Sequence, residues 1–278
     1  MKERGKAEEM ESTIKHNSFG LFFNFLGKKT IKAIDDAGAV TIFFTLSFLK
    51  IFQPRQLREI VQQVFYIGAR SASIVMLIGL FTGMVLGLQL FFTLTKFGSQ
   101  GFLGSVIALS LIRELGPVLT AIMITARAGS AMAAEIGILR ISEQIDALYT
   151  MRIDPQRYLI SPRIAASVIS FPLLTAFFDL IGILGGYLTG VLLLGVDRGA
   201  YFYRILSYVD LTDIRGGFIK SLIFAVIVST TCCFQGYFTN LRTDSYGARS
   251  VSLSTTSAVV FSCVLILIAD YIVTSLLM

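Results

Sequence analysis

Five apolar stretches, each long enough to cross a lipid bilayer, dominate the sequence. A spanning helix needs about 20 mainly apolar residues, because the hydrocarbon core is about 30 Å thick and each residue rises about 1.5 Å. We expect spans over residues 67–94, 102–126, 164–194, 216–238 and 254–277. An ordinary soluble enzyme is largely excluded, because only 15% of the residues are charged and 54% are hydrophobic. The predicted fold class is an all-α integral membrane protein.

The basic residues predict how these spans are oriented. One basic residue, Lys96, lies between the first two expected spans. Five lie between the second and the third, and these are Arg127, Arg140, Arg152, Arg157 and Arg163. Segments rich in arginine and lysine stay in the cytoplasm, so we expect the N-terminus and this middle segment to be cytoplasmic. Five crossings then place the C-terminus outside.

The N-terminal region precedes the first expected span. Residues 1–17 are charged and lack a sustained apolar run, and we expect residues 1–30 to form a flexible cytoplasmic tail. The apolar stretch at residues 39–49 is too short to span a bilayer. An interfacial amphipathic helix is its favoured interpretation, and a loosely packed cytoplasmic helix is the alternative. Residues 31–278 are predicted to form one membrane domain.

Two spans carry glycines spaced four residues apart. These are Gly79, Gly83 and Gly87 in the first span, and Gly182, Gly186 and Gly190 in the third. Residues four apart share a helix face, where glycine allows another helix to approach closely. The spacing favours tight helix packing, either within the chain or between two copies. The alternative is that glycine is simply common in membrane helices.

Five ionisable residues are expected inside the spans, namely Arg113, Glu114, Asp179, Lys220 and Asp270. A charge at the bilayer centre costs about 2.5–3.5 kcal/mol on insertion scales, so such side chains should face protein or water. Arg113 and Glu114 project about 100° apart on a helix, so we expect each to have its own partner. Lys220 lies near an expected outer end, from which a lysine side chain can snorkel to the interface. Structural ion pairs and a polar zone in a transport cavity are both compatible with this pattern.

The middle cytoplasmic segment carries apolar residues at helical spacing, which predicts a short amphipathic helix. These residues are Ile136, Leu139, Ile141, Ile145 and Leu148. Such a helix can dock into the groove of a soluble partner. It can equally rest on the membrane surface, and the spacing favours neither interpretation.

Several kinds of catalytic site are missing from the sequence. It has no G-x-x-x-x-G-K-[ST] phosphate loop, so the chain does not hydrolyse ATP through that chemistry. His16 is the single histidine, which excludes a Ser–His protease and an H-E-x-x-H metalloprotease. Cys232, Cys233 and Cys263 form no Cys/His cluster for zinc. We therefore expect neither catalytic residues nor a metal site in this chain.

Four motifs, taken in order, resemble a known family. They are GMVLGLQ (83–89), ALSLIRELGPVLTAIMITARAGSAMAAEIG (108–137), SEQIDAL (142–148) and DPQRYLISPRIAASVISFPLL (154–174). Their combination resembles MlaE-type permeases, the membrane subunits of lipid-transporting ABC systems that work with MCE proteins. The resemblance extends from about residue 55 to the C-terminus and leaves the N-terminal tail uncovered.

The resemblance implies a permease that forms a homodimer, with each copy bound to an ABC ATPase subunit. ATP and magnesium would be held by that ATPase, and this chain would bind no cofactor of its own. The system would move phospholipids between the bacterial inner membrane and periplasmic MCE-domain lipid-binding proteins, and so act in lipid asymmetry. Nucleic acid is not an expected partner.

The resemblance also implies an interfacial N-terminal helix, five membrane helices and roles for individual residues. A phospholipid cavity between the two copies would be lined by Arg113, Glu114, Lys220, Leu86 and Gln89. The middle amphipathic helix would be the coupling helix that transmits motion of the ATPase. Its candidate residues are Glu135, Arg140, Glu143, Gln144 and Asp146.

Two other functions remain open at this point. An ion- or proton-coupled secondary transporter would use Asp179, Glu114 and Asp270 as relay carboxylates, although five spans without a visible inverted repeat disfavour it. A membrane scaffold that transports nothing would keep all the intramembrane charges as structural pairs. Gradient-driven uptake would distinguish the first from an ATP-driven permease, and lipid exchange with ATP would argue against the second.

Overall fold

The computed structural model describes residues 38, 45, 57–241 and 247–277. Within these residues every element of regular secondary structure is a helix. The expected tail at residues 1–30 and the expected interfacial helix at residues 39–49 lie outside the described residues, except for position 45. The helices named below all belong to the compact unit formed by Leu46–Met278.

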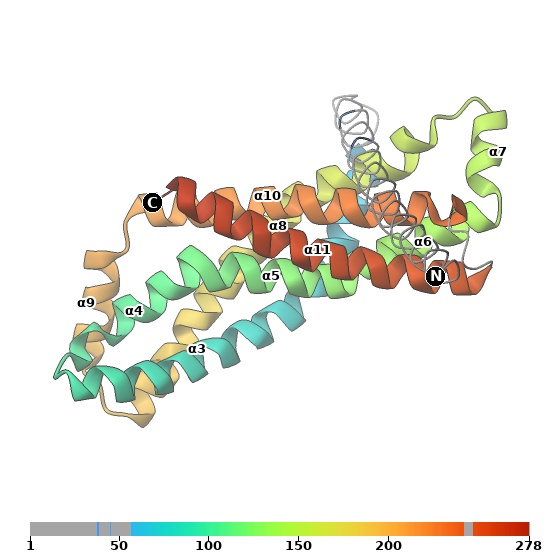
Figure 1. Ribbon diagram of the computed structural model, residues 1–278. Coiled ribbons are helices and arrows are strands. Elements are labelled where there is room, and N and C mark those ends of the chain that lie inside the picture. Colours follow the sequence, from blue (N-terminus) through green and yellow to red (C-terminus); the bar gives the residue numbers. More distant parts are fainter. Residues whose placement is uncertain (1–37, 39–44, 46–56, 242–246, 278) are drawn as a thin grey trace, which may run out of the picture. The chain divides into compact units, whose positions relative to one another are not determined.

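Five helical segments of the described chain are long and apolar enough to cross a membrane, which confirms the predicted number of spans (Figure 1). They are Leu57–Lys96, Gln100–Ile141, Gln156–Leu193, Leu211–Tyr237 and Ala248–Leu277. Every segment begins earlier in the chain than the stretch expected from hydropathy. The reason is that a helix can continue past the hydrocarbon region, where apolar side chains are no longer required.

The first three spans are interrupted by π-helical turns, whereas the last two are continuous α-helices. The first span comprises α2 (Leu57–Val64), η2 (Phe65–Ala69) and α3 (Arg70–Lys96). The second comprises η3 (Gln100–Phe102), α4 (Leu103–Ser110), η4 (Leu111–Leu115), α5 (Gly116–Ile124), η5 (Thr125–Gly129) and α6 (Ser130–Ile141). The third comprises η6 (Gln156–Ile160), α8 (Ser161–Tyr187) and η7 (Leu188–Leu193). The fourth is α10 (Leu211–Tyr237) and the fifth is α11 (Ala248–Leu277).

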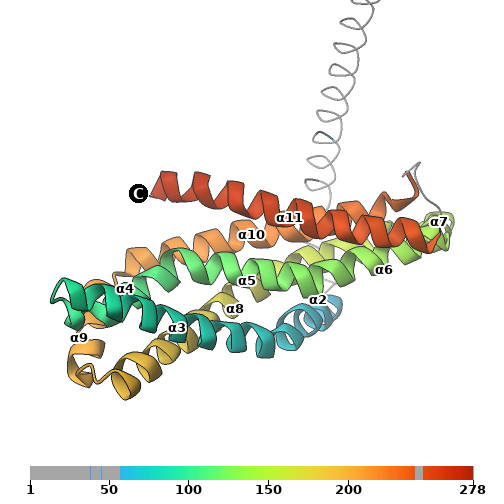
Figure 2. The same cartoon turned by 60° about the horizontal axis from the view of Figure 1, so that its bottom comes forward.

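Shorter helices connect the spans. They are α7 (Gln144–Thr150) after α6, α9 (Arg198–Tyr208) before α10, and the 3-10 turn η8 (Thr239–Leu241) after α10. In both views α7 lies at one end of the spans and α9 at the other (Figures 1 and 2). Because α7 belongs to the arginine-rich middle segment, its end is the one that we expect to be cytoplasmic.

The middle segment differs from its prediction. The second span does not end near Ala126 but continues as a helix to Ile141. Glu143 then adopts a left-handed backbone conformation with φ of 59° and breaks the helix. The single amphipathic helix expected around residues 136–148 is therefore divided between the end of α6 and the separate helix α7. The spacing of apolar residues does not predict this break, because apolar residues continue at helical spacing on both sides of it.

Gly79, Gly83 and Gly87 lie where α3 packs against the third span within one chain. A methyl group added to Gly83 would collide with the carbonyl oxygen of Gly182. A Cβ on Gly79 would lie 2.8 Å from the carbonyl oxygen of Phe178, and one on Gly87 would lie 3.2 Å from Thr189 Cβ. Glycine therefore brings the two backbones closer than any other residue would permit.

The other glycines of the third span make room for the second span. A Cβ on Gly186 would lie 2.9 Å from Ile107 Cδ1. One on Gly190 would lie 2.6 Å from Leu103 Cδ2. Tyr201 of α9 reaches the same region, where it is fully buried and donates a hydrogen bond of 2.9 Å to a backbone carbonyl of α8. Burial raises the pKa of the Tyr201 hydroxyl, so it remains a donor and holds α9 against the spans.

Replacing Gly83 with alanine is expected to destabilise the protein, because α3 would have to move away from α8. Overpacking of this kind costs about 1–3 kcal/mol. The measurement is the thermal unfolding midpoint of the purified protein in detergent. Gly101→Ala is the matched control, since the space around Gly101 is open. Equal midpoints for Gly83→Ala and Gly101→Ala would contradict the prediction.

Candidate functional site

The site begins with a break in the backbone of the second span. At the π-turn η4 the amide of Gly116 bonds to the carbonyl of Leu111, five residues earlier. Pro117 follows and has no N–H, so the carbonyl of Arg113 loses the donor that a regular helix would supply. Lys220 of α10 fills this vacancy, with its Nζ donating to the Arg113 carbonyl oxygen at 2.9 Å. A side chain of the fourth span therefore completes the backbone of the second.

Lys220 has three oxygen neighbours. Besides the Arg113 carbonyl, Nζ lies 2.6 Å from Glu114 Oε2 and 3.1 Å from Asp270 Oδ1. The contact with Asp270 is an ion pair without the alignment of a hydrogen bond. The lysine side chain is only 3% exposed. The expectation that Lys220 snorkels to the interface is therefore wrong, because acceptors from two other spans surround its ammonium group.

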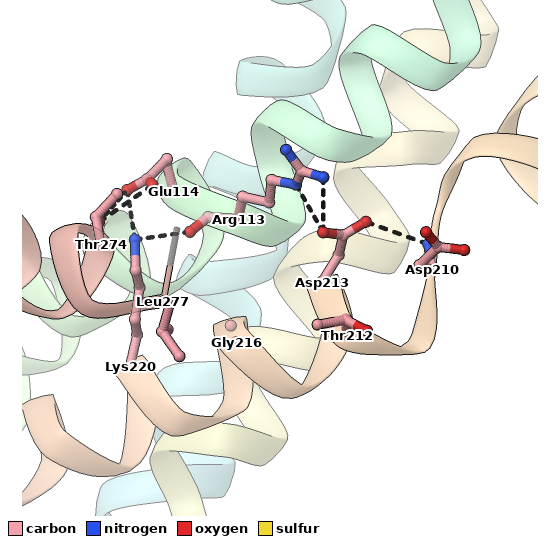
Figure 3. Close-up of a pocket in the computed structure, with 10 residues that line it drawn as sticks. Arg113, Glu114, Asp210, Thr212, Asp213, Gly216, Lys220, Thr274 and Leu277 are labelled. Carbon is pink, nitrogen blue, oxygen red and sulfur yellow. Dashed lines mark hydrogen bonds and ion pairs between the residues drawn. The ribbon is translucent and has the colours of Figure 1, made fainter.

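Arg113 and Glu114 have different partners, although they are adjacent in sequence (Figure 3). Arg113 Nε and one terminal nitrogen both lie 2.8 Å from Asp213 Oδ1 in the first turn of α10. Asp213 is itself held in a capping box, in which its other oxygen accepts the backbone amide of Asp210 at 3.2 Å. α10 thus binds the second span at two points, one for each charge.

A cavity of about 410 Å³ lies among these residues (Figure 3). Its lining comes from the second, fourth and fifth spans and the residue before α10: Arg113, Glu114, Asp210, Thr212, Asp213, Gly216, Gly217, Lys220, Thr274 and Leu277. Arg113 and Glu114 are 45% and 38% exposed, whereas Lys220 is buried. The cavity therefore presents the exposed charges of Arg113 and Glu114, together with the carboxylates Asp210 and Asp213, beside a lysine that is already paired.

Two residues expected at the cavity lie elsewhere in the described structure. Leu86 packs against the hydrophobic core, and Gln89 is exposed on α3. Neither is among the residues that line the cavity. The family resemblance implied that both residues line a cavity between two copies of the chain. A single chain does not enclose that cavity.

The three carboxylates considered as a relay do not form one group. Glu114 and Asp270 meet at Lys220. Asp179 of α8 lies instead against Gly116, where any side chain at position 116 would collide with Asp179 Oδ1. That oxygen is buried and has no hydrogen-bond partner within the described chain.

The residues expected in the coupling helix divide into three groups. Glu135 lies within α6 and bonds to other spans: Oε2 accepts from Arg163 at 2.9 Å, and Oε1 accepts from the Tyr66 hydroxyl at 2.8 Å. Arg140 and Asp146 form a 2.8 Å ion pair across the turn between α6 and α7. Glu143 and Gln144 are exposed.

A tyrosine pair joins α7 to α10. The hydroxyls of Tyr149 and Tyr237 are 2.6 Å apart, and the guanidinium of Arg140 lies 5.6 Å from the centre of the Tyr237 ring. Arg140 therefore contacts both Asp146 of α7 and Tyr237 of the fourth span.

Sequence reasoning missed seven of the ten residues that line the cavity, among them Asp210, Asp213 and Thr274. Asp210 and Asp213 precede the span expected over residues 216–238, although their spacing is that of a capping box and marks the start of a helix. That signal places Asp213 in the first turn of α10, within reach of the second span. Thr274, whose hydroxyl lies 3.3 Å from Glu114 Oε1, has no comparable signal in the sequence.

Lys220→Met is expected to destabilise the protein by about 3–5 kcal/mol, because it removes the buried cation that Glu114 and Asp270 share. It also leaves the Arg113 carbonyl without a donor. The unfolding midpoint in detergent measures the loss. Lys96→Met is the matched control, since Lys96 is exposed at the end of α3. If both variants unfold at the wild-type temperature, the buried pairing of Lys220 does not stabilise the fold.

Comparison with known proteins agrees with this architecture. A family model described as Permease MlaE matches residues 60–276. The intermembrane phospholipid transport system permease protein MlaE of Haemophilus influenzae is 41% identical over 264 residues, which cover 92% of this chain and 97% of that protein. A probable ABC transporter permease protein of Rickettsia typhi is 38% identical and covers 91% of this chain and 96% of its own length. A membrane protein with five such spans and these relatives belongs to the MlaE permease family.

Proposed function

We propose that the chain is the permease subunit of an ATP-driven phospholipid transporter of the bacterial inner membrane. The Haemophilus relative is named for intermembrane phospholipid transport, and it matches nearly the whole chain. The observation that carries the proposal is the cavity of about 410 Å³ inside the spans, with exposed Arg113 and Glu114 in its lining. A phospholipid head group carries charges that such a lining can bind, and its acyl chains suit the apolar helix surfaces around it.

The proposal includes the partners and the orientation of the chain. Two copies form a homodimer, each copy binds an ABC ATPase subunit that holds ATP and magnesium, and an MCE-domain protein exchanges lipid with the pair. The chain has no phosphate loop in its sequence, so hydrolysis belongs to the partner. The N-terminus is cytoplasmic, residues 1–30 form a tail, and residues 31–278 form the membrane domain.

In this proposal α7 and the turn before it contact the ATPase. Glu143 and Gln144 are exposed and available for the contact. Arg140 and Asp146 hold the turn in shape through their 2.8 Å ion pair. Glu135 acts differently, since its bonds to Arg163 and Tyr66 fix the base of α6 against two other spans.

Purification of the full-length chain from its native membrane is expected to recover an ABC ATPase and bound phospholipid. Replacing both Glu143 and Gln144 with arginine should reduce the recovered ATPase several-fold and leave bound phospholipid unchanged, because the change alters only the exposed turn. Lys96→Glu is the control at the opposite end of the spans. An intact, monodisperse protein that carries neither ATPase nor phospholipid would overturn the proposed function.

Glu114→Lys is expected to impair transport without abolishing assembly, because it places a second cation beside Lys220. The assay measures ATP-dependent transfer of a fluorescent phospholipid from proteoliposomes that contain the whole complex. Lys96→Glu is the control, a charge reversal at an exposed position. If Glu114→Lys transfers lipid at the wild-type rate, Glu114 has no role in transport. Transfer driven by an ion gradient in the absence of ATP would favour a secondary transporter.

A further inference from the structure

The cavity has an uneven distribution of free donors and acceptors. An ammonium group has three N–H donors, and Lys220 already faces three oxygens at 2.6, 2.9 and 3.1 Å. The lysine side chain is only 3% exposed, so these oxygens shield its ammonium group from a phosphate. Arg113 directs Nε and one terminal nitrogen at Asp213, and its other terminal nitrogen has no hydrogen-bond partner among the described residues. The Arg113 side chain is 45% exposed, so this nitrogen is accessible to a ligand.

Glu114 supplies the free acceptor. Its Oε2 binds Lys220, whereas its Oε1 has only a long contact of 3.3 Å with the Thr274 hydroxyl. The Glu114 side chain is 38% exposed, so Oε1 is open to a ligand. A ligand in the cavity can therefore meet a cationic donor at Arg113 and an anionic acceptor at Glu114.

The formal charges of the cluster are unequal. Arg113 and Lys220 are its cations, and Glu114, Asp210, Asp213 and Asp270 are its carboxylates. Carboxylates still outnumber cations if Asp270 holds its proton. This excess repels a ligand of net negative charge and attracts a ligand that brings a positive one.

We propose that the cavity prefers phospholipids whose head group carries a primary ammonium over those whose head group is a net anion. This inference rests on the proposed function and names its substrate class. The ammonium donates to Glu114 Oε1, and the phosphate accepts from the free terminal nitrogen of Arg113. A quaternary ammonium brings the charge but no N–H donor, so choline lipids rank between ethanolamine and glycerol lipids.

The test is native mass spectrometry of the full-length chain, with any subunits that copurify, after removal of bound lipid. An equimolar mixture of phosphatidylethanolamine, phosphatidylcholine and phosphatidylglycerol with identical acyl chains competes for the protein. The ethanolamine lipid gains a charged hydrogen bond to Glu114, and the glycerol lipid is repelled as a net anion. Together these two effects correspond to at least about tenfold preference for the ethanolamine lipid.

Three variants assign the preference to the cavity. Glu114→Gln should reduce the ratio to about threefold or less, because the amide keeps the shape but loses the charge. Asp213→Asn should raise glycerol-lipid binding several-fold, because Arg113 loses its partner while the cap on Asp210 can be kept by the amide oxygen. Asp197→Asn is the control: it removes one charge at the start of α9 and preserves an N-cap residue, so the wild-type ratio is expected.

The outcomes separate this inference from the proposed function. Equal binding of the three lipids, or preference for the glycerol lipid, would overturn the head-group preference and leave a phospholipid permease in place. A wild-type preference that survives in Glu114→Gln would also overturn it. Binding of none of the lipids would overturn the proposed lipid site together with the preference.

Discussion

The requirement that every backbone carbonyl in a membrane find a donor inside the protein explains how this site is built. Pro117 breaks that rule within the second span, since it cannot donate to the Arg113 carbonyl. Lys220 restores the bond, and it brings a charge that itself needs partners in a region poor in water. Glu114 and Asp270 provide them. One missing amide hydrogen thus accounts for a three-span charge cluster, and the cavity lies where that cluster reaches the surface.

The glycine contacts determine how much freedom the rest of the fold has. α3 and α8 are in backbone contact at Gly83 and Gly182, so neither can shift toward the other. The second span packs on the same pair through Ile107 and Leu103. Helices joined this closely move together, because displacement would open voids along the whole contact. Glycines also bring α10 against the second span, because a Cβ on Gly217 would lie 2.5 Å from the Ile112 carbonyl oxygen and one on Gly236 would lie 2.7 Å from the Ala133 carbonyl oxygen.

The sequence predicts the membrane class, the number of spans and most of the charged residues of the site, because each follows from local patterns. It does not predict which charges pair. Lys220 appeared free to snorkel because its position in the span was known and its neighbours in space were not. The second span was expected to end near Ala126, since hydropathy reports the part of a helix that lipid surrounds and not where its hydrogen bonding stops. Asp213 was missed for another reason: its capping-box spacing with Asp210 is present in the sequence and places the carboxylate on α10, but it was not used.

α10 connects the two ends of the protein. Its last residue, Tyr237, contacts Tyr149 of α7, and Lys220 near its beginning enters the cavity. Between them α10 has no π-turn, so a displacement at one end is carried along the helix axis to the other (Figure 2). The second span has π-turns at η4 and η5, and such turns are frequent at functional sites that must deform. At η4 the two spans are in close contact, since Gly217 of α10 lies against the Ile112 carbonyl and Lys220 bonds to the Arg113 carbonyl. A displacement of α10 therefore acts directly on this turn.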